Sequence, residues 1–283
     1  MHRAARGRRT TRCFRRAASQ SNEPLQGSEP LQSDPSFDAF VSTIAPSDGS
    51  TAAEDETITP EPDESSTEET STVTVTSTPD PNANADPNDY VVQRVNINFD
   101  QLLSINSDAV AWLYLQDSQI NYPVMKAPLD DPDYYLDHLY DRSENIVGSL
   151  FIDPTTDETF SGRNAVIHGH RMNNGSMFGT LNRYKKQTYY NGNPIMQLYT
   201  PAGITDYYVY IFAAYETDIS SYYRTVFSDD ADFQTYLNEC ISKSVISTLV
   251  TPTASDSIVT LSTCVLGNDL KRMVVQGILV PME

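Results

Sequence analysis

Short apolar runs with an alternating pattern begin near residue 90 and continue to the end of the chain. Turn signals such as DDPD, NGNP and PAG separate them, and two or three short helical patterns lie between them. The runs typical of β-strands are AWLYL, INYPVM, SLFID, NAVIH, IMQLYT, DYYVYIFAAY, SIVTLSTC and RMVVQGILV. The pattern of residues 90–283 therefore predicts a mostly β domain, which is an antiparallel barrel or sandwich with a few short helices.

Two segments carry a clear helical pattern. Asn98 is followed three residues later by Gln101, a variant of the capping box that predicts a short helix through FDQLLSI. The segment DDADFQTYLNECISKS has an acid-rich first turn, which favours a helix N-terminus. Its apolar side chains are expected on one helical face, and they are Phe233, Tyr236, Leu237, Cys240 and Ile241. Cys240 is accordingly expected to be a small buried residue.

The region before residue 90 has a different composition. Residues 1–16 carry seven arginines and no acid, whereas residues 17–89 carry sixteen Asp or Glu and no Lys or Arg. The Ser, Thr, Pro and acid of residues 17–89 cannot bury enough apolar surface to offset the entropy of folding, so we expect a disordered acidic linker. The basic segment alone is weak evidence for nucleic-acid binding, and no partner of that class is predicted.

The chain contains three cysteines, Cys13, Cys240 and Cys264, and this odd number implies no disulfide framework. Cys264 differs from Cys240 because it ends a predicted strand, IVTLSTC. Alternation places it on the same face as Ile258, Thr260 and Ser262, and this mixed face is interpreted as a groove. The loop VLGNDLK follows, and a hairpin would bring Arg272 close to Cys264. A thiol has an ordinary pKa of about 8.5, so a nucleophilic cysteine needs a nearby base or cation.

The four histidines of the chain are His2, His138, His168 and His170. Two of them flank one glycine in NAVIHGHRM, which is compatible with a metal clip or with a single catalytic imidazole. A zinc site requires at least three protein ligands. The sequence offers no third ligand, since His138 lies in YYLDHLY, a segment interpreted as helical. No metal is predicted, and without a Gly-rich phosphate loop no nucleotide cofactor is predicted either.

Several motifs together resemble one family. TLSTC is followed by an arginine eight positions later, and a Gly-His pair, a Met and the segment NGSMF lie about ninety residues upstream. In this combination the chain resembles a class B sortase. Further blocks similar to that class are FDQLLSINSDAVAWLYL, INYPVM, YYLDHLY and GSLFID, and the resemblance extends over roughly residues 95–281.

The resemblance implies an eight-stranded sortase-type β-barrel and assigns roles to individual residues. Cys264 would be the nucleophile, His170 the acid and base, and Arg272 the third member of the triad. Ser262, on the strand face of the cysteine, would contact substrate. His168 stands where the class commonly has an aromatic residue. It either lines the same groove and influences the charge of His170 or replaces the aromatic ring in packing.

The resemblance also implies a function, that of a cysteine transpeptidase on the outer face of the plasma membrane of a Gram-positive bacterium. Such an enzyme cleaves a Thr–Gly type bond in the sorting motif of a surface protein and transfers the acyl group through a thioester. The acceptor would be an amine of a cell-wall precursor or of a pilin, and no cofactor is needed. Membrane association is implied, yet the chain contains no run of about 18 apolar residues. We expect the anchor to be encoded upstream or in another frame.

Other functions compete with this interpretation. A peptidoglycan L,D-transpeptidase also uses Cys and His, but its Ser-His-Gly-Cys surroundings are absent from the sequence. A papain-like hydrolase would place its cysteine before its histidine, at the start of a helix. A stalked, non-catalytic surface-binding module would account for the linker but would leave Cys264, His170 and Arg272 unexplained.

Overall fold

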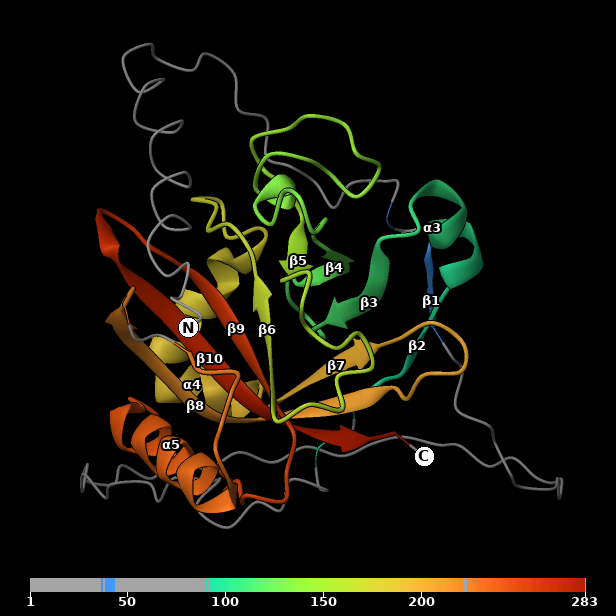
Figure 1. Ribbon diagram of the computed structural model, residues 1–283. Helices are drawn as coiled ribbons and strands as arrows, with labels where there is room; N and C mark the ends of the chain where they lie inside the picture. Colours follow the sequence, from blue (N-terminus) through green and yellow to red (C-terminus); the bar gives the residue numbers. More distant parts are fainter. Residues whose placement is uncertain (1–36, 38, 44–89, 91, 221–222, 283) are drawn as a thin grey trace, which may run out of the picture.

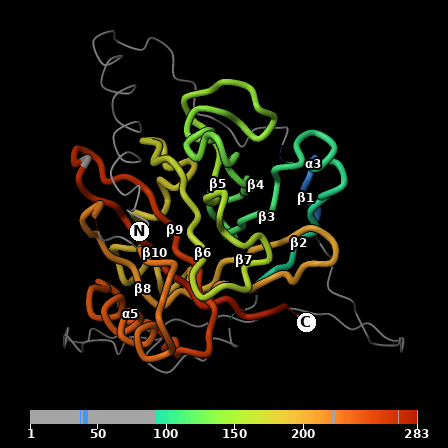
Figure 2. Tube along the Cα trace, viewed as in Figure 1, coloured from blue at the N-terminus to red at the C-terminus, as the bar shows by residue number. Residues whose placement is uncertain are grey.

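A closed barrel of eight strands forms the centre of the molecule (Figure 1). The computed structural model describes residues 37, 39–43, 90, 92–220 and 223–282, whose path is traced in Figure 2. Around the barrel the strands follow the order β10-β8-β7-β3-β4-β5-β6-β9. Their bounds are β3 Ala109–Tyr114, β4 Asn121–Lys126, β5 Leu150–Ile152, β6 Asn164–His168, β7 Ile195–Tyr199, β8 Tyr207–Asp218, β9 Ile258–Val265 and β10 Asn268–Pro281.

The prediction of a mostly β domain is thus confirmed, and of the two predicted architectures the barrel is the correct one. Neighbouring strands pair antiparallel except for β4 with β5 and β6 with β9, which are parallel. The parallel pairing of β6 and β9 is important for function, because it places the ends of NAVIH and IVTLSTC at the same end of the barrel. Apolar side chains such as Val124, Ile167, Leu261 and Val275 fill the barrel interior.

Three α-helices and two 3-10 helices are described in the structure. They are α3 Phe99–Ile105, η2 Tyr134–Leu136, η3 Phe178–Lys185, α4 Gln187–Gly192 and α5 Asp230–Lys243. The predicted cap of α3 is confirmed, since the backbone N–H of Gln101 donates to Asn98 Oδ1 at 3.0 Å. The apolar face of α5 packs on the outside of β8, β9 and β10. Ile241 is an exception, 36% exposed, because it lies about 100° around the helix from the buried Cys240.

A short N-terminal segment belongs to the folded domain. Strand β1 (Val41–Thr43) pairs antiparallel with β2 (Val95–Ile97), and Phe40 is buried against Trp112. The predicted disordered linker 17–89 therefore does not extend through residues 39–43. These residues carry Phe and Val, which can bury apolar surface, unlike the acid-rich sequence that follows them. Apart from Phe37, the basic segment 1–16 and the remainder of the predicted linker lie outside the described residues.

The chain between β4 and β5 is mostly non-helical. The helical interpretation of YYLDHLY is correct only for Tyr134–Leu136, which form η2. His138 instead forms an isolated β-bridge with Glu144, and its ring stacks on Tyr134. Among the helices that the structure describes, none combines the length and the apolar character needed to cross a membrane.

Candidate active site

The β9–β10 hairpin places Cys264 and Arg272 directly opposite each other. Their Cα atoms are partners in the antiparallel register, as the sequence predicted. Val265 pairs with Asn268, which leaves Leu266 and Gly267 as the turn. Gly267 has φ +72°, a conformation that favours glycine, so the sequence of the loop supports the hairpin.

The two side chains lie on the outer face of the barrel. Met273 and Val275 point into the barrel core, so alternation turns Arg272 outward together with Val274. Arg272 is only 7% exposed, and β10, which carries it, is paired on both sides, with β9 and with β8. Its Nη1 donates to the Lys271 carbonyl at 3.0 Å. Cys264 itself is partly exposed, as a nucleophile that must meet a substrate has to be.

Strand β6 brings the histidine pair to the same end of the barrel. His168 is the parallel partner of Ser262, and the N–H of Gly169 donates to the Ser262 carbonyl at 3.2 Å. His170 therefore follows directly after the point where β6 meets the end of β9. The glycine between the histidines is required by packing, since a Cβ there would lie 2.4 Å from Leu150 Cδ2.

The imidazole of His170 is held by a backbone carbonyl. Its Nε2 lies 2.7 Å from the carbonyl oxygen of Leu136, and its own carbonyl accepts from the N–H of Phe178 at 2.9 Å. A carbonyl can only accept a hydrogen bond, so Nε2 carries a proton in this arrangement. This contact was not visible in the sequence, because the partner is a backbone atom 34 residues away.

A partly buried polar network supports the segment that carries Leu136. The hydroxyl of Tyr135 donates to Asp108 Oδ2 at 2.7 Å and accepts from Asn106 Nδ2 at 2.8 Å. Arg142 completes the network by donating from Nη2 to Asp108 and from Nε to Asn106, each at 3.1 Å. Burial, and then the bond to Asp108, raise the pKa of Tyr135, so this hydroxyl stays protonated. No sequence pattern predicted a role for these residues.

His168 has the surroundings of an aromatic packing residue. Its ring lies 5.3 Å from the ring of Phe151 and 5.7 Å from the ring of Tyr223, the latter in an edge-to-face arrangement. Of the two roles predicted for His168, these contacts favour replacement of an aromatic ring.

The outer face of β9 is less open than predicted. Ser262 is 3% exposed, and Thr260 is fully buried. Thr260 donates to Asn164 Oδ1 at 2.8 Å and accepts from Gln276 Nε2 at 3.0 Å, so a polar network covers the face that was predicted to be a groove. The groove interpretation is therefore wrong for this part of β9, whereas Cys264 at the end of the strand remains accessible.

Cys240 is chemically different from Cys264. It is buried in α5, as predicted, and the hydroxyl of Tyr215 donates to its Sγ at 3.4 Å. Burial raises the pKa of the Cys240 thiol, which opposes formation of a thiolate. Cys13 lies outside the described residues. Within the described part of the chain, no group of three or more His, Cys, Asp or Glu side chains could hold a metal ion.

Comparisons with known proteins agree with this geometry. The family model for the sortase domain matches residues 113–280 of this chain. Sortase B of Listeria monocytogenes is 38% identical over 182 residues, which are 63% of this chain and 72% of the relative. Sortase B of Staphylococcus aureus is 34% identical over 186 residues, which are 65% of this chain and 75% of the relative.

Solved structures show the same relationship. A crystal structure of S. aureus sortase B has a TM-score of 0.60 at 33% identity and covers 65% of this chain and 87% of the other. The S. aureus sortase B–substrate complex has a TM-score of 0.61 at 33% identity, with coverages of 65% and 85%. The chain, whose barrel carries a cysteine and an arginine in register beside a histidine, therefore belongs to the sortase family and is a class B sortase, a cysteine transpeptidase.

Proposed function

We propose that Cys264, His170 and Arg272 carry out the transpeptidation, and that the substrate is a surface protein with a C-terminal sorting motif. The observation that supports this most strongly is the register of the β9–β10 hairpin, which pairs Cys264 with Arg272. The hydrogen bond from the Gly169 N–H to the Ser262 carbonyl supports the position of His170 at the same end of the barrel.

In the first half of the reaction, the thiolate of Cys264 attacks the carbonyl carbon of a Thr–Gly type bond. A C–S bond forms, the C–N bond breaks, and the departing amine takes a proton from His170. The product is a thioester between Cys264 and the surface protein. Cys264 is suited to this step because it is accessible, whereas Cys240 is buried.

We assign the transferred proton to Nδ1 of His170. Nε2 is held by the Leu136 carbonyl at 2.7 Å and stays protonated, so Nδ1 is the nitrogen that gains and loses a proton during the cycle. The hydrogen bond to the Leu136 carbonyl also fixes the plane of the imidazole ring. A fixed ring is needed because the acid must reach the departing amine.

Arg272 stabilises the negative charge that develops on the carbonyl oxygen or holds the substrate backbone. Its guanidinium is planar, stays charged at all working pH values and offers several donors in a fixed arrangement. The buried position on a strand that is paired on both sides limits its movement.

In the second half, an amine from a cell-wall precursor or a pilin lysine attacks the thioester. The new C–N bond forms, the C–S bond breaks, and the proton of the amine passes to His170, so the enzyme returns to its starting state. Structures of S. aureus sortase B with a substrate and of sortase B with triglycine support an amine acceptor. We place the enzyme at the outer face of the plasma membrane of a Gram-positive bacterium, as the family association with the cell surface supports.

Substitution of the two described cysteines tests the proposal. Cys264→Ala should abolish both cleavage of a fluorogenic sorting peptide and transfer to an amine, with a melting temperature close to that of the parent. Cys240→Ala is the matched control and should keep kcat/KM while lowering the melting temperature, because it removes a buried side chain. Residual turnover by the Cys264 variant would exclude this mechanism.

A further inference from the structure

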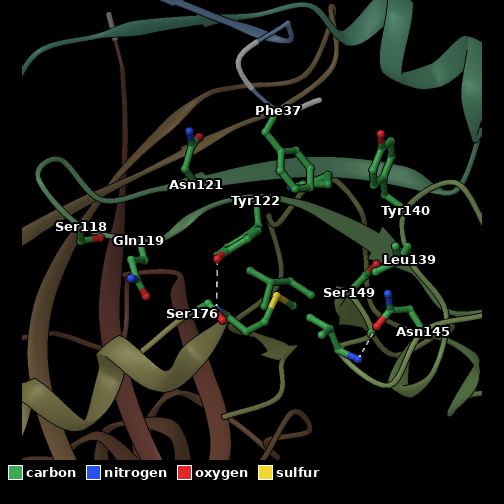
Figure 3. Close-up of a pocket in the computed structure, with 15 residues that line it drawn as sticks. Phe37, Ser118, Gln119, Asn121, Tyr122, Leu139, Tyr140, Asn145, Ser149 and Ser176 are labelled. Atoms are coloured by element: carbon green, nitrogen blue, oxygen red, sulfur yellow. Dashed lines mark hydrogen bonds between the residues drawn. The ribbon is translucent and has the colours of Figure 1, made fainter. Parts of the chain in front are cut away.

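A cavity of about 470 Å³ lies beside the catalytic end of the barrel (Figure 3). Three segments and one isolated ring enclose it: the β3–β4 turn with the start of β4, the chain before β5, the segment after His170, and Phe37. Its volume lies within the range of about 300–1,000 Å³ that is usual for small-molecule sites.

The cavity and the catalytic histidine share their supporting segments. Met177, which lines the cavity, forms a β-bridge with Arg171, the residue next to His170. On the other side, the N–H of Ser149, a lining residue, donates to the Tyr135 carbonyl at 2.9 Å, next to Leu136. A ligand in the cavity would therefore contact the segments that flank and support His170.

The lining excludes a charged ligand. None of its fifteen residues is Asp, Glu, Lys, Arg or His. A phosphate, a carboxylate or an ammonium group would enter without a counter-charge, and burial of an unpaired charge is costly. The ligand that fits this cavity is neutral.

Aromatic rings form one side of the cavity. The ring of Phe37 lies 5.8 Å from the ring of Tyr122, edge to face, and 5.3 Å from the ring of Tyr140. Figure 3 shows Phe37 between the two tyrosines. The Tyr122 hydroxyl accepts from the N–H of Met177 at 3.2 Å, so its own O–H can donate. Rings of this kind stack on the C–H face of a pyranose, and their hydroxyls bond its oxygens.

Amide side chains provide the polar groups. Asn121 Oδ1 accepts from Trp112 Nε1 at 2.7 Å, and Asn145 Oδ1 accepts from the N–H of Val147 at 3.0 Å. Both contacts leave the amide NH₂ as the group to be offered to a ligand. Gln119 is exposed at the rim and adds a third amide. Amides and hydroxyls without charge match the hydroxyl and acetamido groups of an amino sugar.

An extended peptide fits less well. Peptides often bind by adding a strand to a free sheet edge. Strand β4 is paired with β3 along its length and with β5 from Val124 onward. Beside the cavity it carries Pro123, which has no backbone N–H to donate to an added strand, so this edge is a poor template for a peptide.

We propose that this cavity binds a neutral N-acetylated saccharide of one or two rings. The role of the cavity rests on the proposed function: the saccharide is the carbohydrate part of the amine acceptor. The cavity shares its walls with the segments that flank and support His170, so we expect the amine of the same molecule to reach the thioester from this side.

Binding to the full chain can be measured without any turnover. N,N′-diacetylchitobiose is the probe, and a tripeptide that is acetylated and amidated at its ends is the matched neutral peptide. The chain has one tryptophan, and Trp112 donates to a lining residue, so its fluorescence reports on the cavity, with backbone NMR shifts as the second measurement. We expect saturable changes with the disaccharide that centre on the lining residues. Absence of such changes, shifts centred elsewhere, or equal or stronger binding of the peptide would each overturn the proposal.

A pair of substitutions adds specificity to the test. Gln119→Glu places a charge at the rim and should weaken disaccharide binding at least tenfold, whereas Gln234→Glu on α5 makes the same chemical change far from the cavity and should not. Gln119→Glu should also reduce the preference for a saccharide-linked amine over the bare amine in transfer assays. If the disaccharide binds but no thioester forms on Cys264, the proposed function fails and the site stands. If the thioester forms but no disaccharide binds, the site fails alone.

Discussion

Tyr135→Phe tests whether the network under Leu136 controls the catalytic imidazole. The substitution removes one hydroxyl from a fully buried ring and changes no volume of consequence. Asp108 keeps its bond from Arg142 and so loses one contact of two. Asn106 keeps its bond to the Tyr140 carbonyl and those that its Oδ1 accepts from Arg142 and from the N–H of Asp108, so it loses one contact of four.

The expected cost follows from these contacts. A hydrogen bond to a charged group contributes about 1.5–3 kcal/mol to stability. Asp108 has a side chain that is 27% exposed, so water replaces part of the lost contact and the lower end, about 1.5 kcal/mol, applies. For a domain of this size each kcal/mol lowers the melting temperature by about 2–4 °C, which predicts a decrease of roughly 3–6 °C.

Measurement of kcat/KM shows whether Tyr135 only stabilises the fold or also positions His170. If the Leu136 carbonyl shifts, the imidazole loses its fixed plane, and we expect kcat/KM at a temperature where the variant is folded to fall about tenfold, roughly 1.4 kcal/mol in the barrier. Tyr184→Phe is the matched control, since this buried hydroxyl donates to the Asn193 carbonyl instead. A lower melting temperature with unchanged kcat/KM for Tyr135→Phe would refute the reasoning.

The remaining predictions concern the triad and one ion pair at the start of α5. His170→Ala should reduce kcat/KM by orders of magnitude, whereas His168→Tyr should be tolerated; the reverse order would show that the wrong histidine was assigned. Arg272→Lys should lower kcat/KM on the fluorogenic peptide nearly as much as Arg272→Ala, since a lysine cannot reproduce the planar, multiply donating guanidinium. A Lys variant with kcat/KM within about threefold of the parent would show that positive charge alone suffices. Hydrogen bonds from Arg224 lower the pKa of Asp232 to about 2, so this carboxylate stabilises the fold above its unfolded pKa near 4, and that contribution is lost as the pH falls from about 4 to 2. Asp232→Asn should remove that part of the acid dependence in thermal melts.

The sequence carried enough information to predict the local elements and the central pair of the site. The strand patterns of IVTLSTC and RMVVQGILV, with a loop between them, predicted a hairpin that holds Cys264 and Arg272 near each other, and the register confirms this proximity. Their direct pairing depends on a register shift between Asn268 and Arg272, which the pattern did not predict. The cap of α3 at Asn98 was likewise predictable from neighbouring residues. Hairpins and caps depend on residues close in the sequence, which is why pattern analysis can find them.

Features that depend on distant residues could not be predicted. The parallel pairing of β6 with β9 joins segments about ninety residues apart, and β1 pairs with β2 across the predicted linker. The partner of His170 is the Leu136 carbonyl, a group that every residue type possesses, so no side-chain pattern marks it. Burial of Thr260 likewise follows from a network with Asn164 and Gln276 that assembles only in the fold. Tertiary packing decides these features, and strand propensity alone does not.

The most direct test of the account is to trap the acyl-enzyme. The full chain is mixed with a sorting peptide in the absence of an amine acceptor, and the products are analysed by intact mass spectrometry and peptide mapping. We predict an added acyl mass on Cys264, released by hydroxylamine, with Cys240 unmodified. An acyl group on another residue, or turnover of the peptide by the Cys264→Ala variant, would contradict the central claim that Cys264 is the nucleophile.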